Sequence, residues 1–132
     1  MTKPIALVVD DHLANTKLLG FLLERRGMAV RTAATAAAAW AEIEREKPSI
    51  VLMDVQLPDV DGLTLTSRLR REPRYSDLVI VAVTAFAMPG DEEKALGAGC
   101  NAFVTKPIDT QAVGDLVVRL VAPAASGDQE RR

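Results

Sequence analysis

The segment Ile50-Val51-Leu52-Met53-Asp54 decides the fold, because it is apolar throughout and ends in a single carboxylate. A short continuous apolar run is typical of a parallel strand whose two faces are both covered by helices. The stretch that follows, residues 55–62, has the sequence VQLPDVDG and the Pro, Asp and Gly content of a turn. The pattern predicts a buried strand that delivers Asp54 to the edge of a sheet.

Short apolar runs alternate with longer amphipathic segments on both sides of this strand. The runs predict strands at residues 5–9, 28–33, 50–53, 78–83 and 102–105. The amphipathic segments predict helices at residues 13–26, 36–47, 63–71 and 92–97, and a last one after Asp109. Thr35 and Asp109 are expected N-caps, and Gly27 is an expected helix stop. Regular alternation of this kind predicts the α/β class, with a (βα)5 doubly wound parallel sheet.

Length and composition limit the classes of function. The chain has 132 residues, 48% of them hydrophobic, and a formal net charge of −2. This suits one domain, assigned to residues 1–122, with a flexible polar tail at residues 123–132. The balanced charge argues against direct nucleic-acid binding. No apolar run suits a membrane span and no signal pattern is seen, so a soluble cytoplasmic domain is expected. One Cys and one His cannot build a structural zinc site.

Polar side chains stand where the predicted strands end. Asp10 and Asp11 follow the first strand, Asp54 the third, Thr84 the fourth and Lys106 the fifth. The carboxyl ends of parallel strands share one edge of a sheet, where ligands bind. Three carboxylates, a hydroxyl and an ammonium are therefore expected in one crevice.

This set of groups suits a metal ion and a phosphate. Three carboxylates against one ammonium leave a negative excess, and oxygen ligands favour Mg²⁺ as the ion that balances it. Such a site invites phosphoryl transfer, in which a carboxylate can itself be the nucleophile. Asp54 is the expected nucleophile because it stands alone at a strand end, whereas Asp10 and Asp11 are adjacent and alternate in direction.

The same segments resemble the receiver domains of two-component response regulators. The similarity lies in Val8-Val9-Asp10-Asp11, residues 52–62, Val83-Thr84-Ala85 and Phe103-Val104-Thr105-Lys106-Pro107, and it covers about residues 4–121. It implies a CheY-like, flavodoxin-like fold with strand order 2-1-3-4-5. Residues 83–93 also look like single-domain regulators of the DivK type.

The resemblance implies a phosphoacceptor and a metal site. Asp54 would take a phosphoryl group from the phosphohistidine of a histidine kinase or histidine phosphotransferase. Asp11, Asp54 and the backbone carbonyl of Gln56 would bind Mg²⁺, and Asp10 would assist through water.

The resemblance also implies contacts to the phosphoryl group and a switch. Thr84, the backbone amide of Ala85 and Lys106 would contact the phosphoryl oxygens. Phe103 would be the switch aromatic that turns inward as Thr84 moves, without the hydroxyl that Tyr often supplies there. The Lys106–Pro107 peptide bond would be cis, as is common in the family.

The expected function is that of a stand-alone receiver, a regulatory phosphoacceptor and not a metabolic enzyme. It would only catalyse its own phosphotransfer and dephosphorylation, and it would act on a downstream protein as a monomer or a weak dimer. About ten residues follow the last predicted helix, which motivates this expectation. Two alternatives are a receiver cut from a hybrid histidine kinase or larger regulator, and a haloacid-dehalogenase-like phosphatase. The phosphatase needs an Asp-x-Asp motif, which Asp10-Asp11-His12 lacks.

Other polar residues have ordinary structural interpretations. His12 is expected to face solvent at the start of the first helix. Asp59 and Asp61 are expected to form the turn before Gly62 without a ligand role. Cys100 is expected to pack as a small buried side chain.

Overall fold

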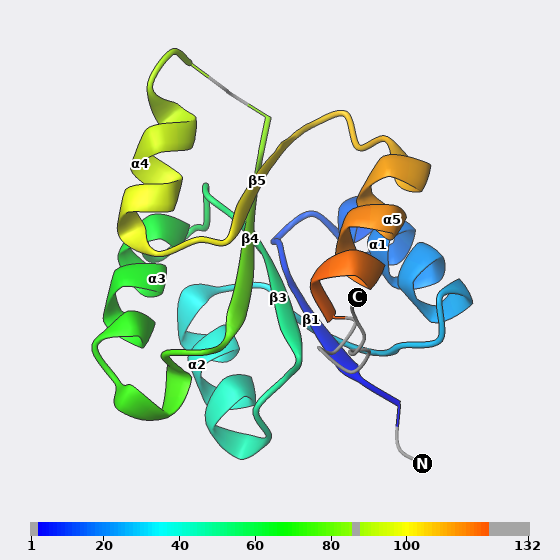
Figure 1. Ribbon diagram of the computed structural model, residues 1–132, viewed down its shortest axis with the longest axis horizontal. Coiled ribbons are helices and arrows are strands. Elements are labelled where there is room, and N and C mark those ends of the chain that lie inside the picture. Colours follow the sequence, from blue (N-terminus) through cyan, green and yellow to red (C-terminus); the bar gives the residue numbers. More distant parts are fainter. Residues whose placement is uncertain (1–2, 86–87, 122–132) are drawn as a thin grey trace, which may run out of the picture.

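Helices cover both faces of a parallel sheet in the computed structural model, which describes residues 3–85 and 88–121 (Figure 1). The strands are β1 (Ile5–Val9), β2 (Ala29–Ala33), β3 (Ile50–Asp54), β4 (Val79–Thr84) and β5 (Ala102–Thr105). The helices are α1 (Leu13–Arg25), α2 (Ala36–Arg45), α3 (Gly62–Arg70), α4 (Asp91–Ala98) and α5 (Thr110–Val121), with a 3-10 turn at Pro73–Tyr75. The strand order is β2-β1-β3-β4-β5 and all pairs are parallel, which confirms the predicted fold and order.

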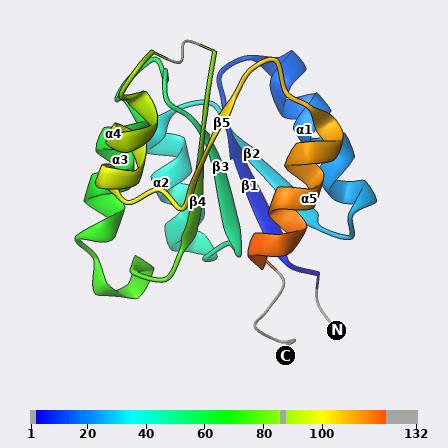
Figure 2. The same cartoon turned by 45° about the horizontal axis from the view of Figure 1, so that its top comes forward.

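Alternate residues of the central strands enter two separate cores. In β3, Val51 and Met53 pack on the side of α2, α3 and α4, whereas Ile50 and Leu52 pack on the side of α1 and α5. Figure 2 shows these two helical layers on either side of the sheet. All of β3 is buried, which explains why its sequence is apolar on both faces.

The predicted helix and strand ends lie within two residues of the observed ones. The Thr35 side chain accepts a hydrogen bond from the Ala38 N–H, which confirms Thr35 as the N-cap of α2. Helix α2 ends at Arg45, two residues before the predicted end, because Glu46 already has extended backbone angles. Gly27 has φ +88° and follows α1, as its predicted role requires.

Leu18 of α1 is 41% exposed, because Leu19, Leu22 and Leu23 fill the contact of this helix with the sheet. Residues 123–132, predicted as a flexible tail, lie outside the described residues. Within residues 3–85 and 88–121, no helix has the length and apolar character needed to cross a membrane.

Asp59 has a capping role that the sequence did not suggest. Its two carboxylate oxygens accept hydrogen bonds from the N–H groups of Ala36 and Ala37, at 2.9 and 3.0 Å. These bonds lower the pKa of the Asp59 carboxyl. The Asp61 carboxylate caps α3 through the Leu63 N–H at 2.7 Å. The loop after β3 is thus tied to the starts of two helices.

Gly62 lets α3 begin directly against the end of β3. A Cβ at this position would lie 2.5 Å from the backbone oxygen of Asp54, which is closer than real Cβ contacts. The Gly62 N–H donates to the carbonyl oxygen of Val55 at 2.8 Å. This close approach fixes the loop that carries Gln56.

Arg70 links the end of α3 to the end of α4. Its guanidinium donates to the carbonyl oxygen of Gly99 at 2.8 and 2.9 Å, to that of Tyr75 at 2.8 Å and to Oδ1 of Asn101 at 3.0 Å. Gly99 has φ +115°, and a Cβ there would lie 2.6 Å from Cγ of Arg70. Glycine is therefore required at this position both by the backbone conformation and by the arginine.

We predict that Arg70→Met lowers the free energy of unfolding by about 2 kcal/mol, because three acceptors lose a charged donor. Urea denaturation followed by circular dichroism measures this loss. Arg68→Met is the matched control on the exposed side of α3, with an expected change below about 0.5 kcal/mol. Equal losses in the two variants would contradict the assignment.

Candidate functional site

The polar residues at the strand ends meet at one edge of the sheet. Asp10 directly follows β1, Asp54 is the last residue of β3, and Lys106 directly follows β5. The Asp10 N–H donates to the carbonyl oxygen of Ala33 at 3.0 Å, and the Lys106 N–H donates to that of Thr84 at 2.8 Å. The sheet's hydrogen-bond pattern thus continues into the site and fixes where these side chains start.

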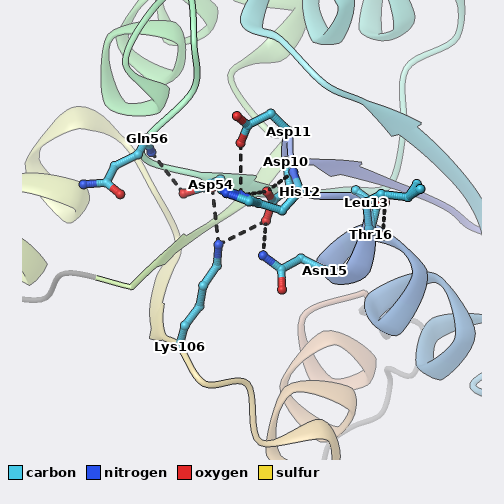
Figure 3. A network of polar contacts seen from close by, with 9 residues as sticks. All are labelled: Asp10, Asp11, His12, Leu13, Asn15, Thr16, Asp54, Gln56 and Lys106. Carbon is cyan, nitrogen blue, oxygen red and sulfur yellow. Dashed lines mark hydrogen bonds and ion pairs between the residues drawn. The ribbon is translucent and has the colours of Figure 1, made fainter.

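Lys106 lies between two buried carboxylates (Figure 3). Its Nζ is 3.1 Å from Oδ2 of Asp10 and 3.3 Å from Oδ2 of Asp54. Asp10 and Asp54 are only 4% and 3% exposed, so their charges need a partner within the protein. The Lys106–Pro107 peptide bond is cis.

Hydrogen bonds occupy both carboxylate oxygens of Asp10. Oδ1 accepts from the backbone N–H of His12 at 2.8 Å, and Oδ2 accepts from the side-chain amide of Asn15 at 3.1 Å as well as from Lys106. Burial opposes the charged form, but these bonds to His12 and Lys106 outweigh it and lower the pKa of Asp10. The sequence analysis did not predict the contact of Asn15 with Asp10. The feature that indicated it is the position of Asn15 in the first turn of α1, shortly after two aspartates.

Asp54 has the opposite electrostatic balance. Burial raises its pKa, and the neighbouring Asp10 charge acts in the same direction. The Gln56 N–H, which donates to Oδ1 at 3.0 Å, and the Lys106 charge offset this only in part. Burial also opposes the charge on Lys106, but its hydrogen bonds and attraction to Asp10 and Asp54 raise the pKa of the ammonium.

Asp11 and His12 complete the cluster on its solvent side. Their side chains are 36% and 66% exposed, which agrees with the predicted exposure of His12. The sequence did not suggest that His12 Nδ1 would lie 3.1 Å from Oδ1 of Asp10 and 3.1 Å from Oδ1 of Asp11. One ligand atom from each of Asp10, Asp11, His12 and Asp54 lies within 4.8 Å of the others. Three carboxylates at this spacing fit a hard divalent cation such as Mg²⁺.

The remaining predicted site residues lie at the ends of β3, β4 and β5. Thr84 is buried at the end of β4, and Ala85 follows it at the surface. Gln56 is exposed, with its N–H on Asp54. Phe103 in β5 is partly buried and packs against the core on the side of α2, α3 and α4. Their contacts with a phosphoryl group and the switch role of Phe103 stay predictions.

Comparisons with known proteins agree with this arrangement. Residues 6–118 match the family described as response regulator receiver domain. The polar-differentiation response regulator DivK of Brucella ovis is 39% identical over 108 residues, which cover 82% of this chain and 87% of that protein. A solved putative response regulator from Chloroflexus aurantiacus is 30% identical, with a TM-score of 0.87 over 92% of this chain and 99% of that one. A CheY-like receiver from Methanospirillum hungatei is 26% identical, with a TM-score of 0.86 over 95% and 98%.

We predict that Asp54→Asn raises the free energy of unfolding at pH 7 in a metal-free buffer. The folded protein raises the pKa of Asp54 above its ordinary value of 3.8, so the ionised group destabilises the fold at neutral pH. The neutral amide removes this cost. The gain should vanish below about pH 3.8, where the carboxyl is protonated in both states. Urea denaturation between pH 3 and pH 7 measures the difference.

Asp10→Asn is the matched variant with the opposite expected sign. The folded protein lowers the pKa of Asp10, so its contribution to stability is present above pH 3.8 and lost as the pH falls through its folded value. The variant should therefore be less stable than the parent at pH 7. The same sign for the two variants would contradict the electrostatic description of the site.

Proposed function

The chain belongs to the response regulator receiver domain family, and on this premise we propose that Asp54 accepts a phosphoryl group from a phosphohistidine donor. The observation that carries the proposal is the pair of Asp54 and Lys106, whose Oδ2 and Nζ atoms are 3.3 Å apart at the ends of β3 and β5. A nucleophilic carboxylate and a cation for the phosphoryl oxygens are the two groups that this transfer needs.

The transfer can be written with its bonds balanced. A carboxylate oxygen of Asp54 forms a bond to phosphorus while the P–N bond of the donor breaks, and the donor imidazole keeps the electron pair. Burial raises the pKa of Asp54, and a more basic carboxylate is a stronger nucleophile. Lys106, the Thr84 hydroxyl and the Ala85 amide would bind the phosphoryl oxygens and stabilise their charge.

The acidic cluster would hold Mg²⁺ through Asp11, Asp54 and the backbone carbonyl of Gln56. Asp10 would act through water, because both its oxygens already accept hydrogen bonds within the protein. When bound, the ion would neutralise charge on the phosphoryl oxygens. Family membership gives no support to the haloacid-dehalogenase alternative, and Asp54 ends β3, whereas that family's nucleophile follows the first strand.

Phosphorylation would act as a regulatory signal and not as a step in metabolism. The phosphoryl group would add up to about two negative charges near Thr84, and this would bias a two-state arrangement of Thr84 and Phe103. The protein would then change its affinity for a downstream protein, as a monomer or a weak dimer and without direct contact to nucleic acid. We place it in the cytoplasm, where histidine kinases use ATP.

Helix α1 would bind the kinase or phosphotransferase. Leu13, Leu18 and Phe21 are 68%, 41% and 62% exposed, although all three are large and apolar. Their spacing places them along one side of the helix, and the first of them adjoins His12 at the site. A groove of about 350 Å³ lies beside Leu18 and Phe21, which line it together with residues that include Arg25 and Gln111. An exposed apolar stripe of this kind marks a protein-binding surface.

We predict that Mg²⁺ and a small acyl phosphate add one phosphoryl mass to the protein. Asp54→Ala should abolish the addition, a chelator should prevent it, and Lys106→Met should slow it about 100-fold because one stabilising charge is lost. Asp59→Asn is the control, since it keeps a capping oxygen for α2. Intact-mass spectrometry gives the readout. A full phosphoryl mass on Asp54→Ala would rule out Asp54 as the acceptor.

We predict that Phe21→Ala slows phosphoryl transfer from a phosphohistidine protein at least about tenfold, because a central apolar contact is lost. The rate with a small acyl phosphate should not change, since this donor needs no docking surface. Leu96→Ala removes a comparably exposed side chain from α4 and serves as the control. A time course of phosphorylation, followed on gels with each donor, measures both rates. Equal slowing with the two donors would contradict a docking role.

A further inference from the structure

His12 contributes a nitrogen to a cluster that otherwise consists of carboxylates and Lys106. Its Nδ1 is 3.1 Å from Oδ1 of Asp10 and 3.1 Å from Oδ1 of Asp11, and a ring nitrogen of His12 lies within 4.8 Å of a carboxylate oxygen of Asp54. Figure 3 marks the contacts of His12 with Asp10 and Asp11 by dashed lines. The imidazole nitrogen is thus located among the atoms that would bind a cation.

The distances between these atoms match the distances between neighbouring ligand atoms around a divalent ion. First-row divalent ions bind nitrogen and oxygen at about 2.1 Å, so neighbouring ligand atoms at right angles lie about 3.0 Å apart and opposite ones about 4.2 Å apart. The 3.1 Å between Nδ1 of His12 and Oδ1 of Asp11 fits the shorter separation. The overall spread of 4.8 Å agrees with a shell that closes slightly when an ion binds.

The His12 side chain is not needed elsewhere in the fold. His12 is the N-cap residue of α1, but its side chain makes no capping hydrogen bond to the helix. Its backbone N–H already donates to Oδ1 of Asp10 at 2.8 Å, so the link between the loop and Asp10 does not depend on the ring. With 66% of the side chain exposed, the ring can turn toward an ion at little cost in packing.

We propose that Nδ1 of His12 is a metal ligand and that it makes the site prefer Co²⁺, Ni²⁺ or Zn²⁺ over Mg²⁺ more strongly than the carboxylates alone would. The inference rests on the proposed function, because Asp11 and Asp54 supply the other ligands. Mg²⁺ takes oxygen ligands, whereas imidazole favours the later first-row ions. The identity of the bound ion would then depend on which divalent ions the cell supplies.

Co²⁺ is the probe of choice, because it reports its ligands by absorption and by paramagnetic NMR shifts. Titrations of the metal-free protein with Co²⁺ and with Mg²⁺ give two dissociation constants, for the parent and for His12→Ala. Thr64→Ala, an exposed uncharged side chain on α3, is the control. Because the chain contains one histidine, a strongly shifted imidazole resonance in the Co²⁺ form can only come from His12.

We expect His12→Ala to weaken Co²⁺ binding at least about tenfold, because the site loses a nitrogen ligand. Mg²⁺ binding should weaken less than Co²⁺ binding, and Thr64→Ala should leave both dissociation constants within about twofold of the parent. Unchanged Co²⁺ affinity, or equal weakening for both ions, would overturn the proposal. If the parent bound neither ion and took up no phosphoryl group, the proposed function itself would fail, so the two failures are distinguishable.

Discussion

The ammonium of Lys106 between the carboxylates of Asp10 and Asp54 is the interaction on which the site depends. Nζ of Lys106 lies 3.1 Å from Oδ2 of Asp10, which is 96 positions away in the sequence. It lies 3.3 Å from Oδ2 of Asp54, which is 52 positions away. Both carboxylates are buried, and two such charges cannot share a site without a cation nearby. Lys106 supplies that cation in the metal-free protein, and it leaves a negative excess that a divalent ion can balance. The buried charges of the site are thus paired within the protein, and the remaining negative charge suits a divalent cation.

The sheet makes this arrangement possible because different residues of one strand pack in the cores and form the charged site. Alternate residues of β3 fill the two cores, while its last residue, Asp54, stands at the edge. The backbone pattern continues past the ends of β1 and β5, so Asp10 and Lys106 start from positions that the ladder has fixed. Gly62 then brings α3 close to the end of β3. The geometry of the charged groups therefore follows from strand pairing more than from loop conformation.

Much of the fold could be predicted from the sequence because its strands are buried on both faces and read as continuous apolar runs. The convergence of Asp10, Asp54 and Lys106 followed from their places at strand ends, since parallel strands bring these ends together. What the sequence did not provide were contacts between segments far apart in the chain. Asp59 caps α2 through the N–H groups of Ala36 and Ala37, which are 23 and 22 positions away in the sequence. Arg70, the last residue of α3, donates a hydrogen bond to the carbonyl oxygen of Gly99. The contact of His12 with both acids depends on one side-chain rotamer, and local patterns carry no information on it.

The start of α1 adjoins both the acidic cluster and the exposed apolar residues of this helix. His12 and Asn15 both contact Asp10, and the exposed stripe of α1 begins at the next residue after His12. A partner that binds this stripe therefore contacts a helix whose first turn is hydrogen-bonded to the acidic cluster. At the other end, Arg26 pairs with Asp115 at 2.9 Å and thereby ties α1 to α5. A change in charge at Asp54 has a short path of polar contacts to the start of α1 through Lys106 and Asp10. Since a coupling of this kind acts equally in both directions, a partner that bound α1 would also change the electrostatic environment of the Asp54 carboxylate.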